Sequence, residues 1–175
     1  YGDPGELMER RAYAIHMIYP QIEKLYCHVY SASGYNKGKA MLKSSFHLVW
    51  PQLIVDADRA PVLRYVTLGI FAKETAKPHS AINSLQDKLV DLHESNVWEL
   101  VFDSTTINAR NGLRLPFSDK ASMVITDEAQ KQQVNDGKIS KTKARKSRVT
   151  ENRPSKPVGT IEFTFKKDLE TGQPT

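Results

Sequence analysis

Residues 43–50 read KSSFHLVW, and their alternation of polar and apolar side chains predicts a β-strand over residues 46–50. Successive side chains of a strand point to opposite faces. One face of this strand therefore carries Phe46, Leu48 and Trp50. Ser45 and His47 share the other face, so the strand has an apolar side and a side with two polar groups. Pro51 ends it, because proline cannot donate a hydrogen bond to a neighbouring strand.

The sequence before this strand predicts a long helix, a short strand and a loop. Residues 4–26 place apolar side chains near helical spacing, and proline at position 4 suits a first helical turn. Pro20 interrupts the pattern, which favours a kink or two shorter helices. A strand is expected at residues 28–30. The glycine- and lysine-bearing stretch SASGYNKGKAMLKS that follows it is typical of a hairpin connection.

Two helices are predicted after the strand at 46–50. Asp58 is placed to cap the first of them. Its expected buried stripe consists of Val62, Tyr65, Val66, Gly69 and Ile70. The second helix is expected to start at Ser80 and to reach Leu92, with apolar residues three and four positions apart.

The remaining elements are predicted to be strands. Residues 98–102 form the next expected strand, with Asp103 at its end. Asn111-Gly112 then predicts a turn that leads into a short strand through Leu115. A last alternating strand is expected at residues 159–166. Strands mixed with helices outside a strict alternation indicate an α+β fold rather than a doubly wound one.

The charge of the chain is concentrated in one segment. At 175 residues the chain has room for one domain with a single core, and its net charge is +5. Residues 138–157 carry eight basic residues and one acid, so the rest of the chain is slightly acidic. Such a segment favours a polyanionic partner, contacted independently of sequence. The basic residues expected to contact nucleic acid are Lys37, Lys39, Arg110, Lys141, Lys143, Arg145, Lys146 and Arg148.

Other classes of protein are disfavoured. No stretch approaches the roughly 18 apolar residues of a membrane helix, and no signal peptide is recognisable at the start. The only cysteine, Cys27, cannot form a disulfide within the chain and is expected to be a small buried side chain. We therefore expect an intracellular protein without a membrane partner.

Three pieces of the sequence together resemble a known family. They are Ser45-Phe46-His47 with Lys43 before it, Asp103 after the apolar stretch WELVF, and the basic stretch NGLRLPFSDK at 111–120. In this order they resemble the archaeo-eukaryotic primase superfamily, especially its primase-polymerase branch. The resemblance covers about residues 1–120.

The resemblance implies a fold and an activity. The fold would be the primase catalytic core, a mixed or antiparallel sheet of the RNA-recognition-motif type flanked by helices. The activity would be template-dependent nucleotidyl transfer for primer synthesis, with Mg²⁺ or Mn²⁺ as metals. The implied partners are a single-stranded DNA template, an NTP or dNTP, and a fused or associated helicase.

The resemblance also assigns roles to residues. His47 and Asp103 would be catalytic, and Asp103 would be one carboxylate of a two-metal site. The triphosphate and neighbouring phosphates would contact Lys43, Ser45, His47, Arg114 and Lys120. Lysine, arginine and a histidine donor can neutralise phosphoryl oxygens.

The chain departs from the family at one point. The family has an acidic pair on a strand before Ser-x-His, and the only Asp-x-Asp spacing here, Asp56 and Asp58, follows His47. We therefore expect the acidic pair to lie upstream of Tyr1 and the chain alone to be inactive. The expected division is a core at 1–127, a basic, mobile loop or insertion at 128–157, and a final strand and tail at 158–175.

Alternatives remain open. The chain could be a non-catalytic nucleic-acid-binding domain of a replication protein, or an unrelated α+β module with a basic tail. Asp103 could simply form a turn, and His47 could be an ordinary histidine at the edge of the core. The other histidines, which show no metal-ligand spacing, are expected to be structural: His16, His28, His79 and His93.

Overall fold

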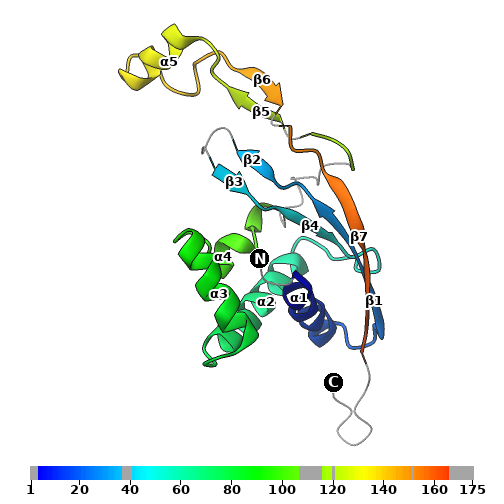
Figure 1. The fold of residues 1–175 in the computed structure, drawn as a ribbon. Helices are drawn as coiled ribbons and strands as arrows, with labels where there is room; N and C mark the ends of the chain where they lie inside the picture. Colours follow the sequence, from blue (N-terminus) through cyan, green and yellow to red (C-terminus); the bar gives the residue numbers. More distant parts are fainter. Residues whose placement is uncertain (1–3, 37–40, 107–115, 120, 151, 166–175) are drawn as a thin grey trace, which may run out of the picture. The chain divides into compact units, whose positions relative to one another are not determined.

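The computed structural model describes residues 4–36, 41–106, 116–119, 121–150 and 152–165. The fold is α+β, as the sequence predicts, with small antiparallel sheets and helices (Figure 1). The helices are α1 (Pro4–Ile18), α2 (Arg59–Thr75), α3 (Ala81–Leu92), α4 (Trp98–Val101), the 3-10 helix η1 (Ser104–Thr106) and α5 (Glu128–Asn135). The strands are β1 (Lys24–Ser31), β2 (Gly34–Asn36), β3 (Met41–Lys43), β4 (Phe46–Val49), β5 (Ala121–Val124), β6 (Ser147–Thr150) and β7 (Lys156–Thr164).

The chain divides into two compact units. Unit 1 consists of Tyr1–His28, Val49–Leu113 and Thr160–Thr175. Unit 2 consists of Val29–Leu48 and Arg114–Gly159. The strands of the described residues form a three-stranded sheet in the order β4-β1-β7 and two two-stranded sheets, β2-β3 and β5-β6. No described helix is both long and apolar enough to cross a membrane.

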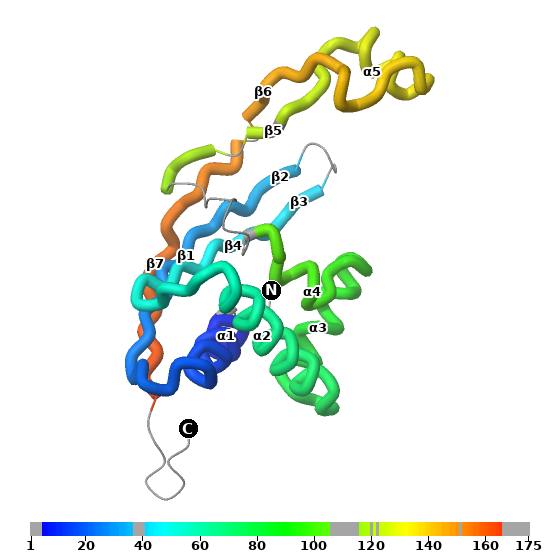
Figure 2. Tube along the Cα trace, turned by 180° about the vertical axis from the view of Figure 1, so that it is seen from behind, coloured from blue at the N-terminus to red at the C-terminus, as the bar shows by residue number. Residues whose placement is uncertain are grey.

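The first apolar cluster of unit 1 lies between α1, β1 and α2. Its buried members are Ile15, Leu25 and Leu63. Trp50 and Phe163 pack against it, with their ring centroids 5.8 Å apart. Figure 2 shows α1 and α2 side by side. Each buried aliphatic side chain contributes about 1.5–3 kcal/mol of hydrophobic stabilisation, which makes this cluster a main source of stability for unit 1.

The second apolar cluster joins α2, α3 and α4. Phe71, Ile82 and Trp98 are its buried members. The ring centroid of Phe71 lies 4.7 Å from the ring centroid of Trp98 and 4.8 Å from that of Phe102. The indole Nε1 of Trp98 donates to Thr75 Oγ1 at 2.8 Å, so the polar atom of the buried ring is satisfied.

A partly buried arginine connects α1 to α2. Arg11 Nη1 donates to the carbonyl oxygen of Leu63 at 3.1 Å and also to Thr67 Oγ1. Burial lowers the pKa of Arg11 to about 10, because the charged guanidinium is largely removed from water. The cost of that burial is offset by these hydrogen bonds.

The predicted helix over residues 4–26 is wrong in its second half. Helix α1 ends at Ile18, a turn follows, and β1 already begins at Lys24. In β1 the side chains of Leu25, Cys27 and Val29 are buried in alternation, which is the period of a strand. Cys27 is buried, as predicted, although it lies on a strand. Its desolvation raises the thiol pKa to about 11.

Helix α2 is correctly predicted, but its stripe and its cap are not. The buried residues are Leu63, Thr67 and Phe71, whereas Tyr65 is 78% exposed. The segment is apolar on more than one side, so its periodicity alone does not fix which side faces α1 and α3. Asp58 makes no capping bond through its side chain. Asp56 takes that role, because its Oδ1 accepts from the backbone N–H of Asp58 at 3.2 Å and of Arg59 at 2.8 Å.

The predicted strand over residues 98–102 is a helix. Helix α4 covers Trp98–Val101, and the backbone N–H of Phe102 donates to Trp98 O at 2.9 Å. Trp98, Val101 and Phe102 all reach the second cluster, and a helix brings residues three and four apart to one side. A strand would place Trp98 and Val101 on opposite faces.

Three other elements agree with the sequence to different degrees. Helix α3 is confirmed, with Ser80 Oγ accepting from the N–H of Asn83 at 2.9 Å. The predicted hairpin connection between the strands at 28–30 and 46–50 contains two further strands, since β2 pairs antiparallel with β3 and Gly34 lies opposite Lys43. The strand at 46–50 is confirmed as β4, except that it ends at Val49 and that Phe46, expected on an apolar face, is 50% exposed.

Candidate functional site

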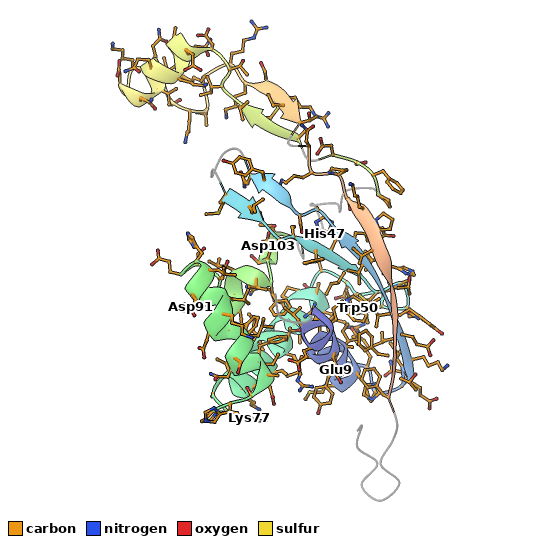
Figure 3. All side chains as sticks on the ribbon, viewed as in Figure 1. Glu9, His47, Trp50, Lys77, Asp91 and Asp103 are labelled. Carbon is orange, nitrogen blue, oxygen red and sulfur yellow. The ribbon has the colours of Figure 1, made fainter. Side chains whose placement is uncertain are left out.

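The Ser45–His47 pair lies in unit 2, at the start of β4. The structure places His47 on β4 with its side chain half-buried, and Ser45 directly before the strand (Figure 3). The backbone carbonyl of Ser45 accepts a hydrogen bond from the N–H of Ala32 at 2.8 Å. Ser45 lies outside β4, so the predicted shared face of Ser45 and His47 stays a prediction.

Two serines that sequence reasoning missed hold this segment. Ser33 Oγ accepts from the N–H of Ser45 at 3.0 Å and lies 3.4 Å from the Ser45 carbonyl oxygen. Ser31 Oγ donates to Ser33 Oγ at 3.0 Å. The Ser-x-Ser spacing at the end of β1 was the available indication, since serine hydroxyls bond to nearby backbone groups where strands end. These bonds fix where β4 starts and therefore which face His47 occupies.

Lys43 completes a group of three donors. It is the last residue of β3 and its side chain is exposed. Within five consecutive residues of unit 2 the chain therefore presents an ammonium, a hydroxyl and an imidazole. All three can donate hydrogen bonds to phosphate oxygens, and the charged donor gives the stronger bond.

A second polar arrangement in unit 2 surrounds Asp119, which sequence reasoning did not single out. Its Oδ1 accepts from the N–H of Arg153 at 2.6 Å, and its Oδ2 accepts from the N–H of Asn152 at 2.9 Å. The N–H of Phe117 donates to Ser155 O at 2.6 Å. These bonds join residues 116–119 to residues 152–155. Asp119 directly precedes Lys120, so it anchors the chain next to a predicted phosphate contact.

Arg153 is buried, although it belongs to the basic segment that was expected to be solvated. Its side chain is 2% exposed, and its Nη1 lies 3.4 Å from the carbonyl oxygen of Ala32. A Cβ on Gly34 would come within 2.8 Å of Arg153 Cγ. Glycine at position 34 therefore makes room for the arginine stem, and Arg153 is a structural residue.

Asp103 does not stand at the end of a strand. It follows α4 in unit 1, is exposed, and accepts from the N–H of Thr105 at 2.8 Å through Oδ1 (Figure 3). This bond begins η1, which agrees with the alternative interpretation of Asp103 as a turn-forming residue. Among the described residues, no three His, Cys, Asp or Glu side chains lie together as a metal site would need. The donor set of a two-metal centre does not fit this part of the chain.

The remaining predicted contacts fall into two groups. Those outside the described residues are Lys37, Lys39, Arg110, Arg114 and Lys120. Those in the basic segment are all exposed: Lys141, Lys143, Arg145, Lys146 and Arg148. Residues 128–157 were expected to be a mobile loop or insertion. They include helix α5 and strand β6, and β6 pairs with β5.

Two of the other histidines, His16 and His28, make contacts within unit 1. His16 is buried in unit 1, where its ring stacks on Phe165 at 4.1 Å and its Nδ1 lies 3.0 Å from the carbonyl oxygen of Ile22. His28 Nδ1 lies 2.8 Å from Thr160 Oγ1. Both contacts tie strands and helix ends together, which agrees with the structural roles predicted for them.

Comparisons of this chain with protein-family models, with curated proteins and with solved structures found no match.

Proposed function

We propose that this chain is the nucleotide-binding part of a DNA primase or primase-polymerase, which transfers nucleotides to a growing primer. The observation that supports the proposal most directly is the run of residues 43–47 in unit 2, with Lys43 ending β3, Ser45 preceding β4 and His47 on β4. It combines the Ser-x-His spacing with a strand and with a cation two residues earlier. The α+β fold is compatible with the primase core that the resemblance implies.

In this proposal the three side chains bind the triphosphate of an incoming NTP or dNTP. The Lys43 ammonium neutralises phosphate charge, and the Ser45 hydroxyl and a ring N–H of His47 donate to phosphate oxygens. Because His47 is half-buried, its hydrogen bond to a phosphate is less weakened by water than an exposed one. The same donors would face the charge that develops on the leaving pyrophosphate.

The reaction implied by the resemblance uses two divalent ions, Mg²⁺ or Mn²⁺, which the described residues do not fit. We therefore derive no step through a metal. A single-stranded DNA template and a helicase, fused or associated, complete the proposed context.

Nucleotide binding tests the proposal directly. Isothermal titration of this chain with a nucleoside triphosphate should give a Kd that rises about tenfold or more in His47→Ala, since a bond to a charged group is worth about 1.5–3 kcal/mol. His79→Asn is the matched control, because His79 is exposed in unit 1 and has a positive φ of 62° that asparagine tolerates. Equal affinities of both variants and the parent chain would contradict the assignment of His47.

Primer synthesis tests the activity. The natural full-length protein, assayed on single-stranded DNA with Mg²⁺ or Mn²⁺, should lose synthesis in His47→Ala while circular dichroism shows an intact fold. Asp103→Asn separates the two interpretations of Asp103. If Asp103 binds a metal, this substitution should abolish synthesis. If Asp103 only forms a turn, synthesis should stay near that of the parent, because asparagine also accepts from the N–H of Thr105.

A second candidate is a non-catalytic nucleic-acid-binding domain of a replication protein. It is favoured by α4, because the family's acid follows a strand and Asp103 follows a helix. This candidate predicts salt-sensitive DNA binding without nucleotide binding at His47. The titration described above distinguishes it from the first.

A further inference from the structure

Opposite charges are separated along residues 121–150, which we call the basic arm. The three acids of the arm all have partners near α5. Asp127 accepts hydrogen bonds from the N–H groups of Ala129 and Gln130. Glu128 forms an ion pair with Lys131 at 2.5 Å, and Asp136 forms one with Lys138 at 3.2 Å. The five remaining cations, Lys141, Lys143, Arg145, Lys146 and Arg148, are all exposed. Within the described chain no carboxylate forms an ion pair with them.

The basic arm contains no aromatic residue. Its sequence, ASMVITDEAQKQQVNDGKISKTKARKSRVT, has neither Phe, Tyr nor Trp. Proteins that bind single-stranded nucleic acid usually stack the bases on aromatic side chains, at about 1–3 kcal/mol per base. The arm lacks that platform, so its cations suit the phosphates of a duplex, whose bases are already stacked on one another.

The ends of the arm form an isolated two-stranded ribbon. Strand β5 pairs antiparallel with β6 in the register Met123 opposite Arg148 and Val124 opposite Ser147. Every residue of β6 is exposed, and Met123 is 61% exposed. Residues directly opposite each other share a face, so Arg148 projects beside the apolar Met123. An antiparallel ribbon with open faces is one of the two shapes that the major groove of B-DNA, about 12 Å wide, admits.

We propose that the basic arm binds double-stranded nucleic acid, with the β5-β6 ribbon lying against a groove and the cations of residues 141–148 on the flanking phosphates. The ligand is thus a duplex, such as a primer paired with its template, rather than the unpaired template strand. The proposal uses residues other than Lys43, Ser45 and His47, and it holds whether or not the chain is catalytic.

Binding of the full chain to a duplex of about 20 base pairs, two helical turns, should be compared with binding to a single strand of equal length. Biolayer interferometry at several salt concentrations gives both affinities. Five phosphate contacts predict a slope of log K against log salt near −4 to −5 for the duplex. We expect the duplex to bind more tightly than the single strand.

Two variants of equal net charge test which cations are responsible. In the arm variant the changes are Lys141→Gln, Lys143→Gln, Arg145→Gln, Lys146→Gln and Arg148→Gln. In the control variant five exposed cations of unit 1 are changed: Lys24→Gln, Arg59→Gln, Lys73→Gln, Lys77→Gln and Lys88→Gln. The arm variant should lose at least tenfold in duplex affinity and most of the salt slope, and the control should lose clearly less.

The outcomes separate the two proposals. Equal losses in the two variants, or tighter binding of the single strand, would overturn duplex binding by the arm. His47→Ala should leave duplex affinity unchanged, and the arm variant should leave the Kd for a nucleoside triphosphate unchanged. Failure of nucleotide binding therefore has no bearing on the arm, and failure of duplex binding has none on His47.

Discussion

Each of the two units is stabilised internally by a different kind of interaction. Unit 1 buries two apolar clusters built around Leu63 and Phe71. The buried residues described in unit 2 are small or polar, apart from Val29: they are Ala32, Ala144, Arg153 and Ser155. Unit 2 relies instead on two-stranded antiparallel ladders and on bonds such as those from the backbone to Asp119.

The comparison indicates that the two units have different roles: unit 1 supplies more of the stability, and unit 2 carries the proposed binding groups. Apolar burial of about 25 cal/mol per Å² supplies most of the folding free energy of a domain, so unit 1 has the larger share. Unit 2 carries the proposed nucleotide donors and the basic arm, whose groups remain accessible to polar ligands. Binding surfaces commonly lie on such less densely packed segments, which a rigid core supports.

The largest effect is expected from Phe71→Ala. Phe71 is fully buried and contacts two other rings, so its truncation should lower the free energy of unfolding by about 3–5 kcal/mol. Urea unfolding followed by circular dichroism measures the loss. Val149→Ala in the ribbon is the control, since Val149 is 36% exposed and should cost well under 1 kcal/mol. Similar losses for both variants would erase the distinction between the units.

The same glycine-to-alanine change should have opposite signs in the two units. Gly34→Ala places a Cβ 2.8 Å from the buried stem of Arg153 and should destabilise the chain by about 1–3 kcal/mol. Gly69 lies within α2 with nothing within 4 Å of an added Cβ, so Gly69→Ala should stabilise by about 0.5–1 kcal/mol. Thermal unfolding of both variants checks the signs. A neutral Gly34→Ala would show that Arg153 moves aside.

The smallest effect concerns a surface ion pair of unit 1. Lys24 Nζ lies 3.1 Å from Glu162 Oε1, and their hydrogen bond raises the pKa of Lys24 and lowers the pKa of Glu162. A lowered carboxyl pKa stabilises the fold above the unfolded value of about 4.3, and the gain disappears as the pH falls through the folded pKa. Lys24→Gln should therefore flatten the loss of stability between neutral and acidic pH slightly. An unchanged profile in urea unfolding would show that the exposed pair contributes nothing measurable.

Local features of the sequence predicted several elements correctly. Ser80 before an apolar period of three and four identified α3 and its cap, because capping needs only neighbouring residues. The alternation around His47 identified β4, whereas the strands β2 and β3 inside the expected connection were not predicted.

The errors arose where distant contacts decide the structure. Residues 98–102 are apolar enough for a strand, and only their contacts with Phe71 and Ile82 show that a helix is required. The buried side of α2 depends in the same way on α1 and α3. Asp119 was missed because its partners, the N–H groups at 152 and 153, lie more than thirty residues away in the chain.

The positions of the two tryptophans have a practical consequence. Trp50 packs beside Phe163 in the first cluster, and Trp98 is buried in the second, so both belong to unit 1. Unit 2 contains no tryptophan. Intrinsic indole emission therefore reports optically on the apolar unit alone, with one probe in each cluster. A shift of that emission on adding nucleotide would mean that a ligand held by Lys43, Ser45 and His47 alters the environment of a ring in the other unit.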